Sequence, residues 1–184
     1  MTACFDPHRP ELAWRGTNAY GFAIVHDSRL GMRIEFVPDP GLPDGVQPFG
    51  VVAVPVFDHR LVVVQVRGQS GWEFPGGHVE LGELPEQAVR RELMEEAAAE
   101  ADWLAPIAHE VLTEDEGRRR YLLVYLARVS RLAPLGERGE VTGRALMPPS
   151  QALGRGLSGR WGQQHIAQVL EFCVARAREL GVPV

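Results

Sequence analysis

The stretch from Gly77 to Ala99 constrains the fold most, because it joins a glycine-rich loop directly to an amphipathic helix. Pro85 suits a first helical position, where its missing N–H is not needed. An apolar stripe recurs every four residues from Val89, so one side of this helix packs against the rest of the chain. The adjacent face carries three glutamates at helical spacing, namely Glu92, Glu95 and Glu96.

Three carboxylates on one helix face oppose the helix by about 0.2–0.5 kcal/mol per pair. One interpretation is a solvated acidic face. The other is a divalent cation site, because Mg²⁺ accepts carboxylate oxygens and commonly also binds substrate phosphates. We therefore treat Glu92, Glu95 and Glu96 as candidate metal ligands. Arg91 can reach Glu95 one turn away and orient it, and Glu83 ends the loop before the helix and could reach the same place.

The spacing of charged residues around this helix is specific. Five residues separate Gly77 from Glu83, and seven separate Glu83 from the run Arg91-Glu92-Leu93-Met94-Glu95-Glu96. Together with the preceding residues Trp72-Glu73-Phe74-Pro75-Gly76-Gly77, this pattern resembles the signature of the Nudix, or MutT-like, hydrolase family. Ala98 departs from it, because the family usually has Gly near the end of the box. Gly would end the helix in a left-handed turn, so here either the helix continues to Ala101 or Ala98 tolerates strain.

The resemblance implies an α/β fold, a sandwich of helices around a mixed sheet. It implies a hydrolase that cleaves a pyrophosphate bond in a nucleoside diphosphate linked to another moiety, with Mg²⁺ or Mn²⁺ as cofactor. The substrate classes are nucleoside triphosphates, ADP-ribose and nucleotide sugars. Gly76 joins the three glutamates as a metal ligand, and the implied catalytic residues are Glu83, Arg91, Glu95 and Glu96.

Some assignments remain open at this point. The general base is Glu95, Glu96 or an acidic residue of the loop Glu114 to Glu116. A non-catalytic nucleotide-binding module keeps the same fold. A metal-dependent diphosphate isomerase is a third class, but it needs a catalytic Cys or similar acid near the site, and Cys4 and Cys173 are poorly placed in sequence.

Residues outside the helix are also candidates for substrate contacts. Arg67, at the end of a strand, is a candidate for a phosphate contact. Trp72 and Phe74 could stack a base, although buried aromatic residues more often belong to the core. Glu116 lies in a charged loop that is either a solvated hairpin tip or a source of substrate contacts. His165 is expected to be structural.

Composition narrows the class of protein. The chain has 184 residues, 45% of them apolar, and a net charge of −5, as expected for one soluble globular domain. No basic stripe indicates a duplex nucleic-acid partner. The N-terminus shows no signal peptide, and no apolar run is long enough to span a membrane. Two cysteines without zinc-type neighbours favour a reducing, cytoplasmic location.

We expect an N-terminal extension at residues 1–45 and a Nudix domain at 46–184. In the extension, residues 1–17 are expected to be loosely held, and strands 20–26 and 32–37 form a small hairpin of a kind that the resemblance associates with homodimers. The chain after residue 129 is expected to be a loop to Gly143, then a short helix from Pro149, and a helix 161–180 that packs on the sheet opposite the first helix. The core strands are expected at 49–57, 60–66, 103–113 and 121–129.

Overall fold

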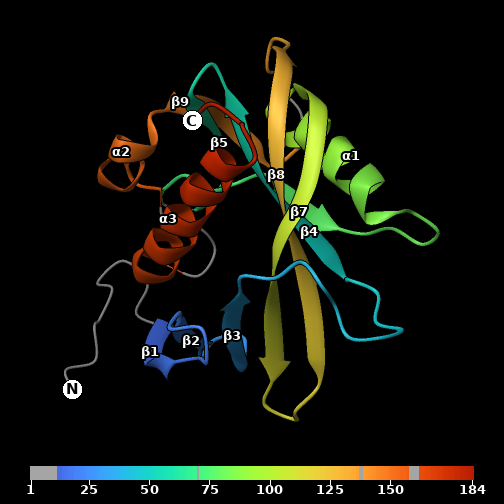
Figure 1. The fold of residues 1–184 in the computed structure, drawn as a ribbon, viewed down its shortest axis with the longest axis vertical. Helices are drawn as coiled ribbons and strands as arrows, with labels where there is room; N and C mark the ends of the chain where they lie inside the picture. The colour runs from blue at the N-terminus through green and yellow to red at the C-terminus, as the bar shows by residue number, and fades with distance from the viewer. Residues whose placement is uncertain (1–11, 70, 137–138, 158–161) are drawn as a thin grey trace.

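The computed structural model describes residues 12–69, 71–136, 139–157 and 162–184. Within these residues, nine strands form one mixed sheet that runs between the helices α1 and α3 (Figure 1). The strands are β1 (Leu12–Thr17), β2 (Ala23–Asp27), β3 (Met32–Val37), β4 (Gly50–Phe57), β5 (Arg60–Val66), β6 (Gly76–His78), β7 (Ala99–Glu114), β8 (Arg119–Leu132) and β9 (Val141–Met147). The helices are α1 (Pro85–Ala97), α2 (Pro149–Ala152), α3 (Gln163–Glu179) and the 3₁₀ turn η1 (Leu153–Arg155).

The strand order is β1-β2-β3-β7-β8-β4-β5-β9, with β6 pairing beside β4. Strands β4 and β8 are parallel, with Val52 opposite Val124, whereas the pairs on both sides of them are antiparallel. The expected mixed sheet is therefore confirmed. The connection between β4 and β5 is also as expected, since Asp58 and His59 both have positive φ, which suits a tight hairpin turn.

Alternate residues of the central strands build two separate cores. Val62 and Val64 of β5 face α1, while Leu61 and Val63 face α3. The uninterrupted valines of β5 are buried on both faces, as the lack of polar alternation predicted. Helix α3 therefore lies on the sheet opposite α1, which confirms the expected sandwich (Figure 1).

The N-terminal segment is more ordered than expected. Residues 12–17 form β1, which pairs with β2, so the prediction of a loosely held segment is wrong for this part. Residues 1–11 lie outside the described residues. Strand β3 pairs with β7 over its whole length, from Met32 opposite Glu114 to Val37 opposite His109. The N-terminal strands thus continue the main sheet.

Strand β9 contradicts part of the prediction that residues 130–143 form a loop. Thr142 and Arg144 interrupt the apolar pattern of this segment, so its periodicity does not indicate a strand. Pairing with β5, where Leu146 lies opposite Val62, supplies what the local pattern lacks. No helix among the described residues combines the length and apolar character needed to cross a bilayer.

Candidate active site

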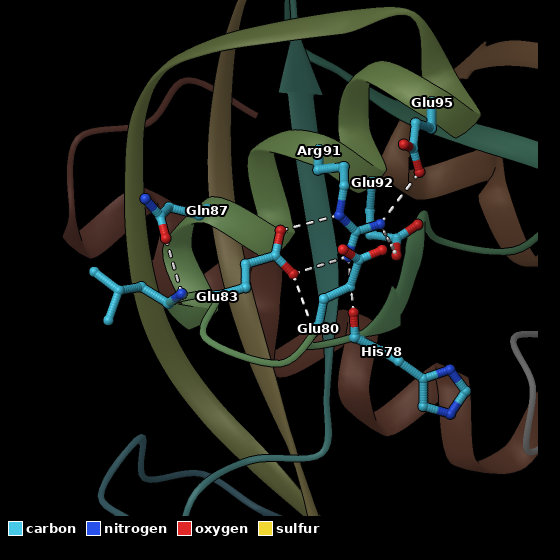
Figure 2. A network of polar contacts seen from close by, with 8 residues as sticks. His78, Glu80, Glu83, Gln87, Arg91, Glu92 and Glu95 are labelled. Carbon is cyan, nitrogen blue, oxygen red and sulfur yellow. Dashed lines mark hydrogen bonds and ion pairs between the residues drawn. The ribbon is translucent and has the colours of Figure 1, made fainter.

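Helix α1 begins without a conventional side-chain cap. Leu84 lies at the cap position, and its backbone N–H donates a 2.9 Å hydrogen bond to the side-chain Oε1 of Gln87 (Figure 2). Pro85 at the first helical position needs no N–H partner, and Glu86 places a negative charge in the first turn. These residues fix where the glycine-rich loop passes into the helix.

Arg91 ties this loop to the helix (Figure 2). Its Nε and Nη2 each donate to a different oxygen of Glu83 at 3.0 Å, which is a bidentate pair. Nη2 also donates to the carbonyl oxygen of His78 at 2.8 Å. Nη1 donates to Glu92 at 2.7 Å and to Glu95 at 3.2 Å. The expected contact with Glu95 is present, but the closer partners of Arg91 are Glu83 and Glu92.

This network shifts the pKa of its members in opposite directions. Hydrogen bonding to Glu83 raises the pKa of Arg91 further above its ordinary value. Hydrogen bonds from Arg91, and then from the backbone N–H of Glu80, lower the pKa of Glu83. A carboxylate with a lowered pKa is a weaker proton acceptor. Glu83 is therefore better suited to hold Arg91 than to act as a general base.

The two glycines of the loop allow close contacts that a side chain would block. The backbone N–H of Gly76 donates to Glu96 Oε2 at 2.9 Å. A Cβ at Gly76 would collide with the carbonyl oxygen of Val51 on β4. At Gly77 a Cβ would collide with the carboxylate of Glu92. The loop therefore packs against β4 only when position 76 is glycine, and glycine at position 77 leaves the space that the Glu92 carboxylate occupies.

The C-terminal end of α1 shows whether the helix continues past Ala98 or ends there with strain. The helix ends at Ala97, and Ala98 adopts the left-handed conformation with φ 46° and ψ 43°. Continuation to Ala101 is thus excluded, and strain is tolerated instead. Arg144 of β9 donates to the carbonyl oxygens of Ala97 at 2.6 Å and Ala133 at 2.9 Å. A cation at a helix C-terminus is favourable, so Arg144 helps to stabilise this end.

A cavity of about 440 Å³ opens beside α1 and reaches across the sheet to α3. At one end it is lined by Arg91, Glu92 and Glu96 together with the two glycines. Its middle is lined by apolar residues of β4, β8 and α3 and by two half-buried aromatic rings, namely Val52, Val54, Leu122, Val124, Ile166, Val169, Phe49 and Phe74.

The far end of this cavity holds a buried polar pair. His165 Nε2 of α3 lies 2.9 Å from Glu110 Oε1 of β7, and the two residues are only 3% and 7% exposed. His165 was expected to be structural, and Glu110 was not singled out. A signal was present, because His109 and Glu110 interrupt the otherwise apolar segment from Ile107 to Leu112. A carboxylate at a core-facing strand position usually has a specific role.

Three of the predicted substrate contacts lie outside the described lining of this cavity. Arg67 is exposed just after β5. Trp72 packs on the α3-side core, and its backbone N–H donates to Gly156. Glu116 is exposed in the turn between β7 and β8, where Asp115 donates a backbone hydrogen bond to Gly31. This turn lies against the N-terminal strands at the opposite end of the sheet from α1 (Figure 1). Of the predicted aromatic contacts, Phe74 does line the cavity.

The carboxylates of α1 suit an open metal site. Among the described residues, no three Asp, Glu, His or Cys side chains converge as a closed metal site requires. Glu92 and Glu96 line the cavity, whereas the side chain of Glu95 is 59% exposed. Mg²⁺ usually takes one or two protein carboxylates and completes its shell with water and substrate phosphates. The donor chemistry of this helix therefore fits Mg²⁺ or Mn²⁺.

Comparisons with known proteins point in the same direction. The sequence profile of the NUDIX domain matches residues 47–169. The RNA pyrophosphohydrolase of Acinetobacter baylyi is 39% identical over 56 residues, which cover 30% of this chain and 31% of that protein. The RNA pyrophosphohydrolase of Aeromonas hydrophila is 42% identical over 53 residues, 29% of this chain and 30% of that protein. The similarity thus spans less than a third of the length of these relatives.

Solved structures extend the similarity to the fold. The Bacillus subtilis pyrophosphohydrolase BsRppH superposes with a TM-score of 0.68 at 21% identity, covering 91% of this chain and 98% of that one. The NUDIX domain of Shewanella oneidensis NrtR, solved as a complex with ADP ribose, gives a TM-score of 0.55 at 22% identity over 71% of this chain and 88% of that one. At such identities the similarity establishes the architecture alone.

Proposed function

This chain belongs to the Nudix family, and on that premise we propose that it is a divalent-metal-dependent pyrophosphohydrolase. Its substrates are nucleoside diphosphates linked to another moiety, as in nucleoside triphosphates, ADP-ribose and nucleotide sugars. The observation that carries this proposal is the cavity itself. It joins the carboxylates of Glu92 and Glu96 to an apolar half with aromatic walls, as a molecule with charged phosphates and a flat base requires.

We assign the metal to Glu92, Glu95 and Glu96, with the backbone of Gly76 as a further oxygen donor. When bound, Mg²⁺ or Mn²⁺ supplies charge neutralisation on phosphate oxygens and lowers the pKa of a bound water. The protein's own residues orient these ligands. Arg91 holds Glu92 by a 2.7 Å hydrogen bond, which fixes one carboxylate beside the loop.

Within this proposal Glu96 is the general base. Its carboxylate lines the cavity and is positioned by the backbone N–H of Gly76. Glu83 and Arg91 act by positioning, because Glu83 binds the guanidinium through both of its oxygens. The exposed Glu95 supports the metal from the edge of the site.

A substrate panel tests the proposal. Nucleoside triphosphates, ADP-ribose, nucleotide sugars and an RNA with a 5′-triphosphate are incubated with the protein in Mg²⁺ or Mn²⁺, and released phosphate, pyrophosphate and nucleotide are measured. The RNA is included because two similar proteins are RNA pyrophosphohydrolases. Metal-dependent product release from any of these substrates supports the proposal. Tight binding of a substrate without any product would instead support a binding module.

The variant Glu96→Gln tests the assigned base. We expect kcat to fall by about 10²–10⁴-fold, the usual contribution of a general base, with little change in the thermal unfolding midpoint. Glu86→Gln, which removes an exposed carboxylate from the first turn of the same helix, is the matched control and should keep full activity. Undiminished turnover of Glu96→Gln would refute the assignment.

The diphosphate isomerase alternative has no support from Cys173. This residue of α3 is buried in the core between the helix and the sheet, and burial together with the nearby Glu110 charge raises the pKa of its thiol. Cys173 is absent from the described lining of the cavity. Cys4 lies outside the described residues.

A further inference from the structure

The last turn of α1 carries two of the carboxylates assigned to the metal, those of Glu95 and Glu96. Directly after that turn the chain passes through Ala98, whose backbone is left-handed at φ 46° and ψ 43°. We propose that Arg144 of β9 is a positioning residue, which holds this strained helix end and thereby keeps Glu95 and Glu96 in place for the metal ion. The inference rests on the proposed function, because it takes these carboxylates to be metal ligands.

Arg144 reaches the helix end from a strand that the sheet holds in place. In the pairing of β5 with β9, Arg144 lies opposite Val64, whose side chain belongs to the core between the sheet and α1. Residues directly opposite one another on paired strands share a face of the sheet, so Arg144 lies on the α1 face. Its half-buried side chain is thus anchored in the sheet on which the helix packs.

The contacts of this guanidinium join two backbone segments. Its Nη1 donates to the carbonyl oxygen of Ala97 at 2.6 Å and to that of Ala133 at 2.9 Å, and the carbonyl oxygen of Ala98 lies 3.5 Å away. Ala133, which follows β8, donates its own backbone N–H to the Ala98 carbonyl oxygen at 2.8 Å. Carbonyls at a helix C-terminus lack partners within the helix, and these bonds supply them. The end of α1, the end of β8 and Arg144 therefore form one hydrogen-bonded unit.

The strain at Ala98 explains why this end needs an external restraint. The left-handed conformation brings a Cβ close to the following carbonyl oxygen, so it is unfavourable for a residue other than glycine. Relaxation of Ala98 would redirect the chain two residues after Glu96. The Glu96 carboxylate accepts the backbone N–H of Gly76 at 2.9 Å, and a shift of the last turn would disturb that contact. Arg144 opposes the shift by its hydrogen bonds and by its charge, which the helix C-terminus favours.

A purely stabilising role for Arg144 makes a different prediction. Arg128 and Arg131 of β8 pair with the exposed carboxylates of Asp102 and Glu100, away from the helix end. Arg144 instead binds the carbonyl of the residue that directly follows Glu96. If Arg144 only added stability, its removal would lower the unfolding midpoint and leave the metal affinity of the folded protein unchanged. A positioning role predicts weaker metal binding by protein that is still folded.

Mn²⁺ binding by the folded protein is the direct test. Wild type, Arg144→Met and the control Arg128→Met are titrated with Mn²⁺ without substrate, and free Mn²⁺ is followed by electron paramagnetic resonance at a temperature where circular dichroism shows each protein folded. Loss of a residue that orients metal ligands typically costs 10–100-fold in metal affinity, so we expect binding to weaken about tenfold in Arg144→Met. Arg128→Met removes an exposed strand arginine and should bind Mn²⁺ as wild type does. Unchanged affinity in Arg144→Met would overturn the inference, whatever happens to the unfolding midpoint.

Two further variants keep the test decisive if Arg144→Met folds poorly. Arg144→Lys retains a cation that can donate to the same carbonyls and should retain most of the Mn²⁺ affinity. Glycine adopts the left-handed conformation without strain, so Ala98→Gly/Arg144→Met should bind Mn²⁺ as tightly as Ala98→Gly alone. A loss of affinity that persists in the glycine background would overturn the link to the strained end.

The same titrations separate this inference from the proposed function. Equal Mn²⁺ affinity in wild type and Arg144→Met would leave the proposed function intact, because the glutamates would still bind the metal. Wild-type protein that binds no Mn²⁺ would count against both.

Discussion

The two ends of the cavity are built in opposite ways. The α1 end comes from residues 76–96, which are close in sequence, and its charges range from the buried Glu92, 8% exposed, to Arg91, whose side chain is 24% exposed; the neighbouring Glu95 side chain is 59% exposed. The α3 end is formed by Glu110 and His165, which lie 55 positions apart and are almost completely buried. The first end could therefore be recognised as a sequence pattern. The second exists only because the fold brings β7 and α3 together.

This difference has energetic consequences. Exposed ion pairs contribute about 0–1 kcal/mol to stability, because water and salt screen them. Removing one partner of a buried pair costs about 3–5 kcal/mol, because the other partner loses its compensation. Variants at the exposed charges of the α1 end should thus affect activity more than folding, and variants of the buried pair at the α3 end should affect folding strongly. The following predictions test this contrast, from the largest effect to the smallest.

His165→Leu should have the largest effect on stability. It leaves the buried carboxylate of Glu110 without its imidazole partner, and we expect the free energy of unfolding to fall by about 3 kcal/mol, measured by urea denaturation. The double variant Glu110→Leu/His165→Leu removes both polar groups and should recover most of this loss. If the double variant is as unstable as the single one, the pair is held by something other than mutual compensation.

Gly77→Ala should affect activity rather than folding. The new methyl group would occupy the place of the Glu92 carboxylate, which can move because it ends a flexible side chain. A displacement of about 1 Å in a catalytic group can cost about 10²-fold, and we expect a loss of that order in kcat/KM with a nearly unchanged unfolding midpoint. Gly154→Ala is the control, because nothing lies within 4 Å of a Cβ there. A fully active Gly77→Ala protein would argue against a role for Glu92.

Ala98→Gly should make the protein more stable. Ala98 is held at φ 46°, a conformation that costs a non-glycine residue about 1–2 kcal/mol. Glycine adopts it without strain, so we expect a gain of about 1 kcal/mol in the free energy of unfolding, with unchanged activity. Ala88→Gly, in the interior of the same helix, should instead lose about 1 kcal/mol or more. A destabilised Ala98→Gly protein would show that Arg144 and β9 already compensate the strain.

The smallest effect concerns pH. The pKa of Glu83 is lowered below its ordinary value of 4.5, mainly by Arg91, so its contribution to stability is present above pH 4.5 and is lost as the pH falls through the lowered pKa. In Arg91→Met this contribution should be absent. The stability difference between wild type and variant should therefore shrink on acidification below pH 4.5, as followed by urea midpoints. Arg155→Met, an exposed arginine outside this network, should differ from wild type by a constant amount.

The sequence by itself determined the features that depend on local spacing. The positions of Glu92, Glu95 and Glu96 on one helix face follow from the helical period. The burial of Val62 to Val64 on both faces follows from their uninterrupted apolar character, and the turn at Asp58-His59 from its position between two strands. Each of these is encoded by residues within a few positions of one another.

Only the tertiary structure decided the rest. Strand β9 forms because β5 supplies its hydrogen-bond partners, although Thr142 and Arg144 break its local pattern. The left-handed end of α1 at Ala98 is accompanied by an arginine 46 residues away. Glu110 of β7 and His165 meet because α3 packs on the face of the sheet where the Glu110 side chain lies. Distant partners of this kind have no fixed spacing, so no local pattern in the chain predicts them.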